Sequence, residues 1–181
     1  STIIRDAENA IWGEDNAQVY VHDSKILDCV VGITNTPTFS NLFHSLFGEI
    51  YGTEFSKHAL ILKKEYSGQA PHGKIGRAGV SFMDLDGFQI GDETHAENEF
   101  SLLNYGVDLY HSYAGVTNSH FINIRPDNVY KDPLKSDQQL GVAVHAVNYD
   151  QLQPPTELRF NPALSSPVTI EKCDIGLYNR Y

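Results

Sequence analysis

Apolar residues recur along the chain at fixed offsets from a small residue. Around Gly106, an apolar residue stands six positions before, a small or apolar residue three positions before, and an apolar residue directly after. Gly32 and Gly176 carry the same offsets, and Ala10 carries them with alanine in place of glycine. Two further copies fit when the link before the glycine is lengthened, and these end at Gly79 and Gly141. The chain therefore contains six imperfect copies of one unit.

Short β-forming runs around a small residue, repeated at an interval of about 20 residues, predict a parallel β-solenoid. One unit cannot bury its apolar side alone, so units stack, and equivalent residues lie about 4.8 Å apart along the stack. The glycine should stand where the chain turns a corner and leaves no room for a Cβ. We expect the apolar residue that opens each unit to stack inside, and we call these residues the anchors: Ile4, Ile26, Phe55, Phe100, Phe121 and Ile170.

The longer intervals between anchors predict coils that carry loops. The sequence places these loops at 59–78, 125–140 and 148–167, each rich in turn-forming residues, with one short strand at 158–160. Because the loops interrupt neighbouring coils, we expect them to rise on one side of the solenoid with a ligand groove between them. Residues 1–34 should hold strands, with a turn at 22–24, and no site.

Aromatic residues spaced by four occupy the stretch 35–54. This spacing predicts one face of a helical turn, an excursion that buries its rings against the solenoid. Alternatively, the flat rings form a platform on which sugar rings stack. The residues concerned are Phe39, Phe43, Phe47 and Tyr51.

Three stretches, 24–33, 98–107 and 169–178, resemble coils of right-handed parallel β-helix domains. The resemblance is to large secreted and cell-surface proteins of Bacteroidetes-type bacteria, within the pectate-lyase-like superfold, and it covers nearly the whole chain. It implies an all-β, right-handed parallel β-helix of about six irregular coils with long loop insertions, in a single domain spanning residues 1–181. It also implies an extracellular or cell-surface module for structural display, adhesion or glycan binding. The motif is architectural and identifies no active site.

The chain opens and closes directly within a unit of the repeat. We therefore expect a fragment or processed piece of a longer solenoid, whose partners are flanking coils of its own parent chain or another surface protein. Lys and Arg number 13 against 23 Asp and Glu, giving a net charge of −10. This balance argues against nucleic acid or an anionic membrane surface as the main partner. No apolar run approaches the roughly 20 residues of a membrane span.

The scarce positive charges gather in the first predicted loop. They favour a recognition loop for an acidic polysaccharide, although a solvated Gly- and Pro-rich loop would have the same composition. The candidate ligand-binding residues are Tyr66, His72, Lys74, Arg77 and Tyr130.

An enzyme is the alternative, because right-handed parallel β-helices include polysaccharide lyases and glycoside hydrolases. A hydrolase needs carboxylates that converge on one glycosidic bond, and a lyase needs a cation beside the substrate carboxylate and a base. Lys74, Arg77, Asp84 and Asp86 form the local combination that could supply these groups. Their spacing alone assigns no catalytic role.

Carboxylates are densest between residues 83 and 94. They could bind calcium, which takes six to eight oxygen ligands, but Asp-Gly and Gly-Asp are also ordinary turn sequences. The eight histidines show no spacing typical of a zinc site. We therefore expect no cofactor, with calcium as the one open candidate.

The two cysteines, Cys29 and Cys173, hold the same place in coils that are far apart in the repeat. At about 4.8 Å per coil their Cα atoms lie beyond the roughly 7 Å that a disulfide can span. We expect both to be buried free thiols.

Overall fold

The computed structural model describes residues 1–14, 17–35, 47–57, 76–125, 141–147, 157–160 and 167–180. Only the backbone is described for Phe47, Asp86, residues 157–160 and Arg180. These parts of the chain consist of seventeen strands and their connections, without a helix. They accordingly contain no helix long and apolar enough to cross a membrane.

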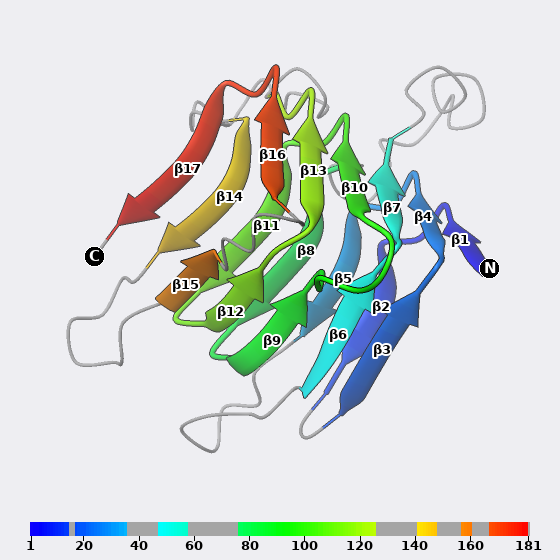
Figure 1. Ribbon diagram of the computed structural model, residues 1–181. Coiled ribbons are helices and arrows are strands. Elements are labelled where there is room, and N and C mark those ends of the chain that lie inside the picture. The colour runs from blue at the N-terminus through cyan, green and yellow to red at the C-terminus, as the bar shows by residue number, and fades with distance from the viewer. Residues whose placement is uncertain are drawn as a thin grey trace, which may run out of the picture.

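The strands form three parallel sheets that the chain visits in a fixed order (Figure 1). Sheet A contains β1 (Ile3–Arg5), β4 (Lys25–Leu27), β7 (Glu54–Ser56), β10 (Asn98–Ser101), β13 (Ser119–Ile122) and β16 (Val168–Glu171). Sheet B contains β2 (Asn9–Gly13), β5 (Val31–Asn35), β8 (Ala78–Met83), β11 (Tyr105–Tyr110), β14 (Val142–Val147) and β17 (Ile175–Arg180). Sheet C contains β3 (Gln18–His22), β6 (Phe47–Tyr51), β9 (Asp86–Ile90), β12 (Tyr113–Val116) and β15 (Glu157–Phe160).

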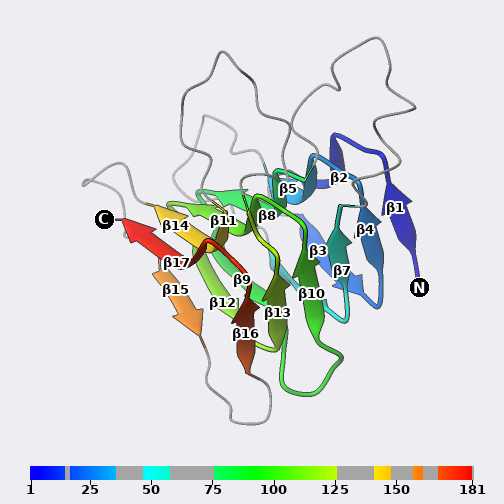
Figure 2. The ribbon, with the colours of Figure 1, turned by 90° about the horizontal axis from the view of Figure 1, so that it is seen from above.

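One passage of the chain through sheets A, B and C is called a coil below. Within each sheet, a strand pairs in parallel with its counterpart in the next coil. Strands therefore stack in sequence order, with β1 at one end and β17 at the other, and the two termini lie at opposite ends of the stack (Figures 1 and 2). The predicted all-β class and parallel pairing are confirmed, and the cyclic order is that of a parallel β-solenoid.

The anchors form one continuous column in sheet A, as predicted. The strand register pairs each anchor with the anchor of the next coil, from Ile4 to Ile170. The rings of Phe55 and Phe100 stack with centroids 4.8 Å apart, and those of Phe100 and Phe121 repeat this distance. All three rings are buried, whereas Ile170, in the last sheet A strand, is 39% exposed. The apolar core therefore contains Ile26, Phe55, Phe100 and Phe121. The prediction that all six anchors stack inside is wrong for Ile170 and holds only in part for the half-buried Ile4, which lie in the two outermost strands of sheet A.

The small residue of each repeat lies inside a sheet B strand, and the reason for it differs from the expectation. A Cβ on Gly32 would lie 2.4 Å from the Gly79 carbonyl oxygen and 2.7 Å from the Phe55 ring, both in the next coil. Glycine at position 32 is therefore required by the close approach of the backbone and the aromatic ring of the next coil, rather than by a corner of the chain. The assignment of Gly141 to this position is wrong, because the register pairs on either side place Ala143 opposite Gly106.

The corners between sheets are made by single residues in the left-handed conformation. After strands of sheet A, this residue is Asp6, Asp28, Leu102, Asn123 or Lys172, with φ between 54° and 58°. Asp and Asn tolerate this conformation because their short polar side chains can hydrogen-bond locally. The predicted turn after β3 has the same basis, since Asp23 has φ of 47°.

Two further expectations are tested by the described strands. The predicted strand at 158–160 is confirmed as β15. The helical turn across 35–54 is wrong for its second half, where Phe47 and Tyr51 belong to β6, paired in parallel with β3. The four-residue spacing of the aromatic residues indicates only a local preference for a helical turn. Strand pairing with the neighbouring coil outweighs that preference. Phe39 and Phe43 lie outside the described residues.

Both cysteines are free, as predicted, but their burial differs. Cys29 is buried and Cys173 only half-buried, so the expectation of two buried thiols holds for the first alone. Cys173 follows β16, the last strand of sheet A, and β16 has a neighbouring strand on one side only. Burial raises the pKa of both thiols above the ordinary value.

Candidate functional site

The structure separates the candidates that sequence analysis grouped together. Arg77 directly precedes β8, and Asp84 directly follows it, so the two residues stand at opposite ends of that strand. At about 3.3 Å per residue, they are on the order of 20 Å apart. Asp84 instead lies 3.3 Å from Nδ1 of His111, the first residue after β11. Asp86 begins β9 in sheet C.

The remaining candidates fall in parts of the chain that the structure leaves undescribed. They are Tyr66, His72, Lys74 and Tyr130. The expectation of a groove between three loops also falls largely outside the described residues, but the strands that these loops connect are described. The ranges 58–75 and 126–140 both connect sheet A to sheet B. The third predicted loop, 148–167, is divided by β15, so that 148–156 connects sheet B to sheet C and 161–167 connects sheet C to sheet A.

A buried acid–base pair lies next to Arg77, on the outer side of sheet B. Asp108 of β11 and His145 of β14 are register partners, and His145 Nδ1 lies 2.7 Å from Asp108 Oδ1. Strand alternation explains the position, since the flanking Val107 and Leu109 point into the core. Asp108 lies between these two residues on its strand, so its side chain faces outward, as does that of its register partner His145.

The donor and acceptor roles of the two side chains follow from the tautomer of His145. An ionised carboxylate only accepts hydrogen bonds, so His145 donates from Nδ1, and neutral imidazole keeps Nε2 as an acceptor. The second oxygen, Asp108 Oδ2, is buried, accepts no hydrogen bond from the described residues, and lies 3.7 Å from Arg77 Nη2. The carboxylate is fully buried, while the Arg77 side chain is 45% exposed. The Arg77 guanidinium is therefore the charged group of this cluster that solvent can reach.

Tyrosine rings surround the imidazole of His145. Ring centroids of Tyr105 and Tyr178 both lie 5.2 Å from that of His145, and Tyr110 lies at 5.8 Å with its ring nearly perpendicular. All three tyrosines are half-buried, whereas His145 is only 7% exposed. The tyrosines, together with Arg77, therefore form the accessible part of this cluster, which we call the sheet B cluster.

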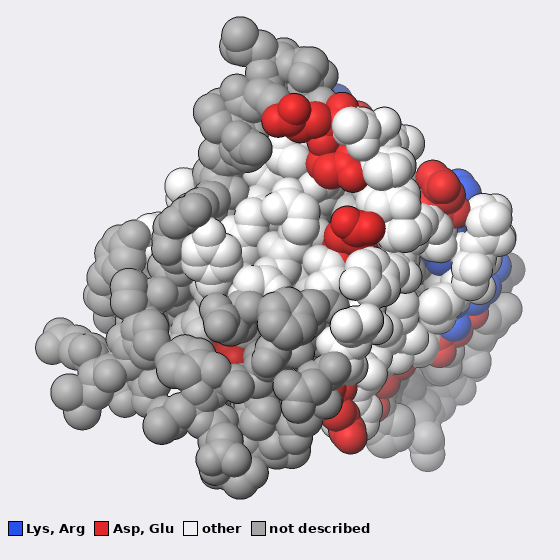
Figure 3. Space-filling view, turned by 60° about the horizontal axis from the view of Figure 1, so that its bottom comes forward, with Lys and Arg blue, Asp and Glu red and all other residues white. Residues whose placement is uncertain are grey.

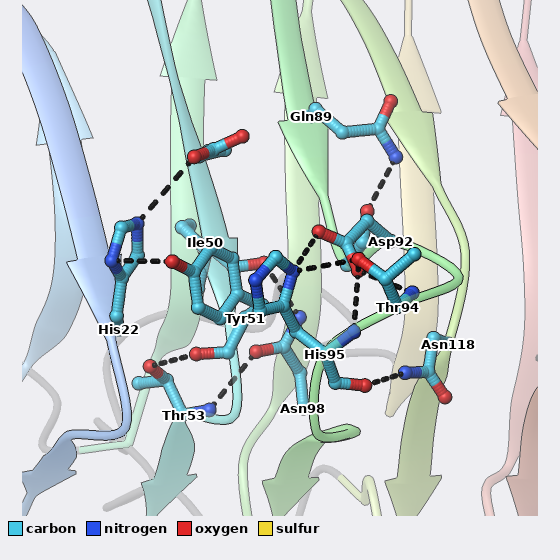
Figure 4. A network of polar contacts seen from close by, with 12 residues as sticks. His22, Ile50, Tyr51, Thr53, Gln89, Asp92, Thr94, His95, Asn98 and Asn118 are labelled. Carbon is cyan, nitrogen blue, oxygen red and sulfur yellow. Dashed lines mark hydrogen bonds and ion pairs between the residues drawn. The ribbon is translucent and has the colours of Figure 1, made fainter.

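A second polar network lies on the outer side of sheet C (Figure 4). The rings of His22, Tyr51 and His95 stack on one another, with centroids 3.7 Å and 3.8 Å apart. Beneath them, the buried Asn98 accepts a hydrogen bond from the Thr53 amide and donates one to the Ile50 carbonyl, both at 3.0 Å. This network joins strands of successive coils.

Sequence analysis missed Asp108, His145 and the ring stack. Asp108 stands two residues after Gly106, and His145 two residues after Ala143, so an alignment of the repeats would have paired them. That alignment was out of register at Gly141. The ring stack had no such signal, because His95 comes from an irregular connection outside the repeat.

No group of three or more His, Cys, Asp or Glu side chains that could hold a metal ion occurs in the described parts of the chain. Within the predicted carboxylate-rich stretch, Asp92 accepts hydrogen bonds from the backbone amides of Thr94 and His95, each at 2.8 Å. The Asp92 carboxylate thus has local partners in the turn that it forms.

Comparison of the chain with protein-family models, with curated proteins and with solved structures found no match.

Proposed function

We propose that this chain is a right-handed parallel β-helix module of six coils that acts without catalysis at a bacterial surface. Its role is structural display, adhesion or glycan binding, in an extracellular setting. Right-handedness is expected because connections between parallel strands of one sheet are right-handed in about 98% of cases. Sheets A and B each contain six strands, which supports the coil number.

The sheet B cluster is the observation that carries glycan binding. Sugars present apolar ring faces and many hydroxyl groups, which suit aromatic rings and side chains that both donate and accept hydrogen bonds. Tyr105, Tyr110 and Tyr178 supply these groups around His145, on a wall of packed strands that holds them in place. Rigid strands position such groups more accurately than loops do.

Surface charge favours a neutral glycan over an acidic one. On the face drawn in Figure 3, acidic side chains are scattered over a mostly uncharged surface, and basic ones gather near one edge. The chain carries a net charge of −10, which repels uronate or sulfate polymers at low ionic strength. Arg77, the one predicted ligand contact whose place is described, already faces a carboxylate.

A polysaccharide lyase or glycoside hydrolase is the second candidate, and the Asp108–His145 pair favours it. A histidine oriented by a buried carboxylate can serve as a general base, and Arg77 could neutralise a substrate carboxylate. Its weakness is access, since His145 is 7% exposed and Asp108 is fully buried. Glycan binding through the half-buried tyrosines does not require a substrate to reach His145 or Asp108, so binding is the first candidate function.

The two functions are separated by incubating the protein with neutral and acidic polysaccharides, with and without calcium. Retention and the appearance of new reducing or unsaturated ends are both recorded. The binding module predicts retention without new ends, weakened by Tyr178→Ala and unchanged by Tyr20→Ala, which removes an exposed tyrosine from sheet C. New ends that disappear in His145→Gln would establish the enzyme instead, and a lack of both retention and cleavage would leave only the structural role.

A further inference from the structure

The first and last coils of the solenoid present strands that, among the described residues, are paired on one side only. These strands are β1, β2 and β3 at one end, and β16 and β17 at the other (Figures 1 and 2). Proteins commonly protect such edges with lysine or proline, because the unpaired N–H and C=O groups can pair with another chain. None of these five strands contains a lysine or a proline. Both ends of sheets A and B are therefore open to strand pairing, whereas the last strand of sheet C, β15, belongs to the coil before.

Apolar side chains are exposed at the same two ends. In the described parts of the chain, five of the seven exposed large apolar side chains belong to the first or the last coil. At the first coil, Ile4, Ile11 and Val21 border a hollow of about 310 Å³. At the last coil, Ile170 is 39% exposed and Leu177 is 48% exposed. Contact with another chain at either end would therefore remove apolar surface from water.

The strand register predicts which residues would meet if a second copy continued the stack. Register partners form columns that run from the first coil to the last, so the last residue of a column would lie opposite its first residue in the next copy. The anchor column and two columns of sheet B extend through all six coils in this way. The resulting apolar and aromatic pairs are Ile170 with Ile4, Leu177 with Ile11, and Tyr178 with Trp12.

Charged residues at the two ends are complementary in the same register. Arg5 begins the column of sheet A that ends at Glu171, and both side chains are about half exposed. The corner residues that directly follow them, Asp6 and Lys172, also have opposite charges and share the left-handed conformation. An in-register junction would therefore form two pairs of opposite charge, which stabilise neighbouring strands.

We propose that copies of this chain stack end to end, so that sheets A and B of one copy are continued by those of the next. The contact joins two different surfaces of the molecule, and a contact of this kind forms an open filament unless its rotation closes a ring. In such a filament, Trp12 of the next copy lies beside Tyr178 and extends the aromatic surface of the sheet B cluster. Stacking rests on the strand register and the end charges, so it does not depend on glycan binding.

Sedimentation velocity over a wide range of protein concentration tests the stacking. At physiological ionic strength the net charge of −10 is screened beyond about 8 Å, and the average mass should rise with concentration. Leu177→Asp should weaken this association about tenfold or more, because it buries a charge in the junction. Leu102→Asp is the matched control, since Leu102 is an exposed leucine in the fourth coil, away from both ends, and it should have no effect. A constant monomer mass at all concentrations, or an equal effect of the two variants, would overturn the proposal.

Charge reversal at the corner tests the junction without relying on Leu177. Asp6→Lys and Lys172→Asp each place like charges across the junction, and both residue types already occupy this corner in the chain. Each variant alone should associate about two- to tenfold more weakly, as expected for an exposed ion pair. An equimolar mixture should regain the association of the wild type, because every end then meets an opposite charge. Asp174→Lys should strengthen association, since in this register Asp174 faces Glu8. A mixture that associates no better than its components contradicts the junction.

Disulfide cross-linking tests the direction of stacking. Register partners of neighbouring coils lie about 4.8 Å apart, within the range that a disulfide spans. The double variant of Trp12→Cys and Tyr178→Cys, in a Cys173→Ala background, should therefore form a ladder of covalent multimers on oxidation. Each single variant should form no ladder. Products of the double variant that stop at a dimer would show that like ends meet, and this result would overturn the end-to-end stacking.

Discussion

Gly79 and Phe100 fit against each other across two coils, because a Cβ on Gly79 would lie only 2.6 Å from Phe100 Cδ1. The same complementarity runs through the solenoid. Where the next anchor is phenylalanine, the small residue is glycine, and where the next anchor is isoleucine, it is alanine. The pairs are Gly32 with Phe55, Gly79 with Phe100, Gly106 with Phe121, Ala10 with Ile26, and Ala143 with Ile170. Each anchor therefore constrains a residue in the coil before it.

Gly79→Ala should destabilise the fold by about 1–3 kcal/mol, the usual cost of adding a methyl group to a close-packed core. The added Cβ would also meet the Gly106 carbonyl oxygen at 2.9 Å, and backbone cannot rotate away. Urea unfolding measures the loss. Gly115→Ala is the matched control, because the three atoms nearest to its Cβ all belong to the end of the Gln89 side chain, and it should change stability less.

The pairing rule predicts a partial rescue of that variant. Combining Gly79→Ala with Phe100→Ile recreates the pair formed by Ala143 and Ile170. The double variant should be more stable than the sum of the two single losses predicts, by about 0.5–3 kcal/mol, the range for residues in contact. Strict additivity of the two losses would show that Gly79 is not constrained by the ring of Phe100.

Phe100→Ala should cost about 3–5 kcal/mol, since it removes a fully buried ring. The ring also stacks on Phe55 and Phe121, so collapse of the cavity would require movement of two further aromatic side chains. Chemical denaturation checks this value. A loss below about 1 kcal/mol would be that of a solvent-exposed residue and would contradict the anchor column.

The anchor column was predictable because a solenoid places equivalent residues on one another. A repeated apolar position therefore indicates both that the segment forms a strand and that its side chain packs on the equivalent side chains of neighbouring coils. The same logic identified Gly79 and Gly106, but it gave Gly141 where Ala143 belongs. An undescribed range of fifteen residues, 126–140, precedes that position, and the length of an insertion contains no information on register.

The candidate sites were less predictable, for two physical reasons. Arg77 and Asp84 are near in sequence, yet an extended strand carries them to opposite ends of β8. Conversely, Asp108 and His145 are distant in sequence, and only the stacking of coils brings them to 2.7 Å. Chemistry on a solenoid is assembled across coils, so local spacing does not reveal it.

His145→Leu should destabilise the protein by about 1–3 kcal/mol, because the buried Asp108 carboxylate loses its hydrogen bond while Arg77 Nη2 still lies 3.7 Å from Oδ2. Adding Asp108→Leu removes the buried carboxylate that has lost its hydrogen-bond donor, so the double variant should recover part of the stability. Thermal or urea unfolding of both variants gives the comparison. If the double variant is less stable than His145→Leu, the carboxylate must have a favourable interaction that does not depend on the histidine.

Neither cysteine should form a disulfide, and both should react slowly with a thiol reagent in the native state. Reaction requires the thiolate, and burial raises the pKa of both thiols, so the reactive fraction near pH 7 falls. Cys173 should react faster than Cys29, because it is half-buried rather than buried. Full reactivity of both in guanidinium is the control, and a mass lower by two hydrogens under non-reducing conditions would contradict the free thiols.

Asp92 should contribute stability at neutral pH that is lost in acid. Burial favours its neutral form, but hydrogen bonds from the His95 side chain and from the amides of Thr94 and His95 outweigh this effect, and the pKa of Asp92 falls below the ordinary 3.8. A carboxyl group whose pKa is lower in the folded state stabilises the fold above its unfolded pKa, and this contribution disappears as the pH falls through the folded value. Stability should therefore fall more steeply below about pH 4 in the wild type than in Asp92→Asn, whose amide oxygen can still accept from the two backbone amides. Urea midpoints at pH 7, 4 and 3 measure the difference, with Asp174→Asn as an exposed carboxylate control. Parallel pH profiles of the wild type and Asp92→Asn would show that the hydrogen bonds of this turn do not lower the pKa of Asp92.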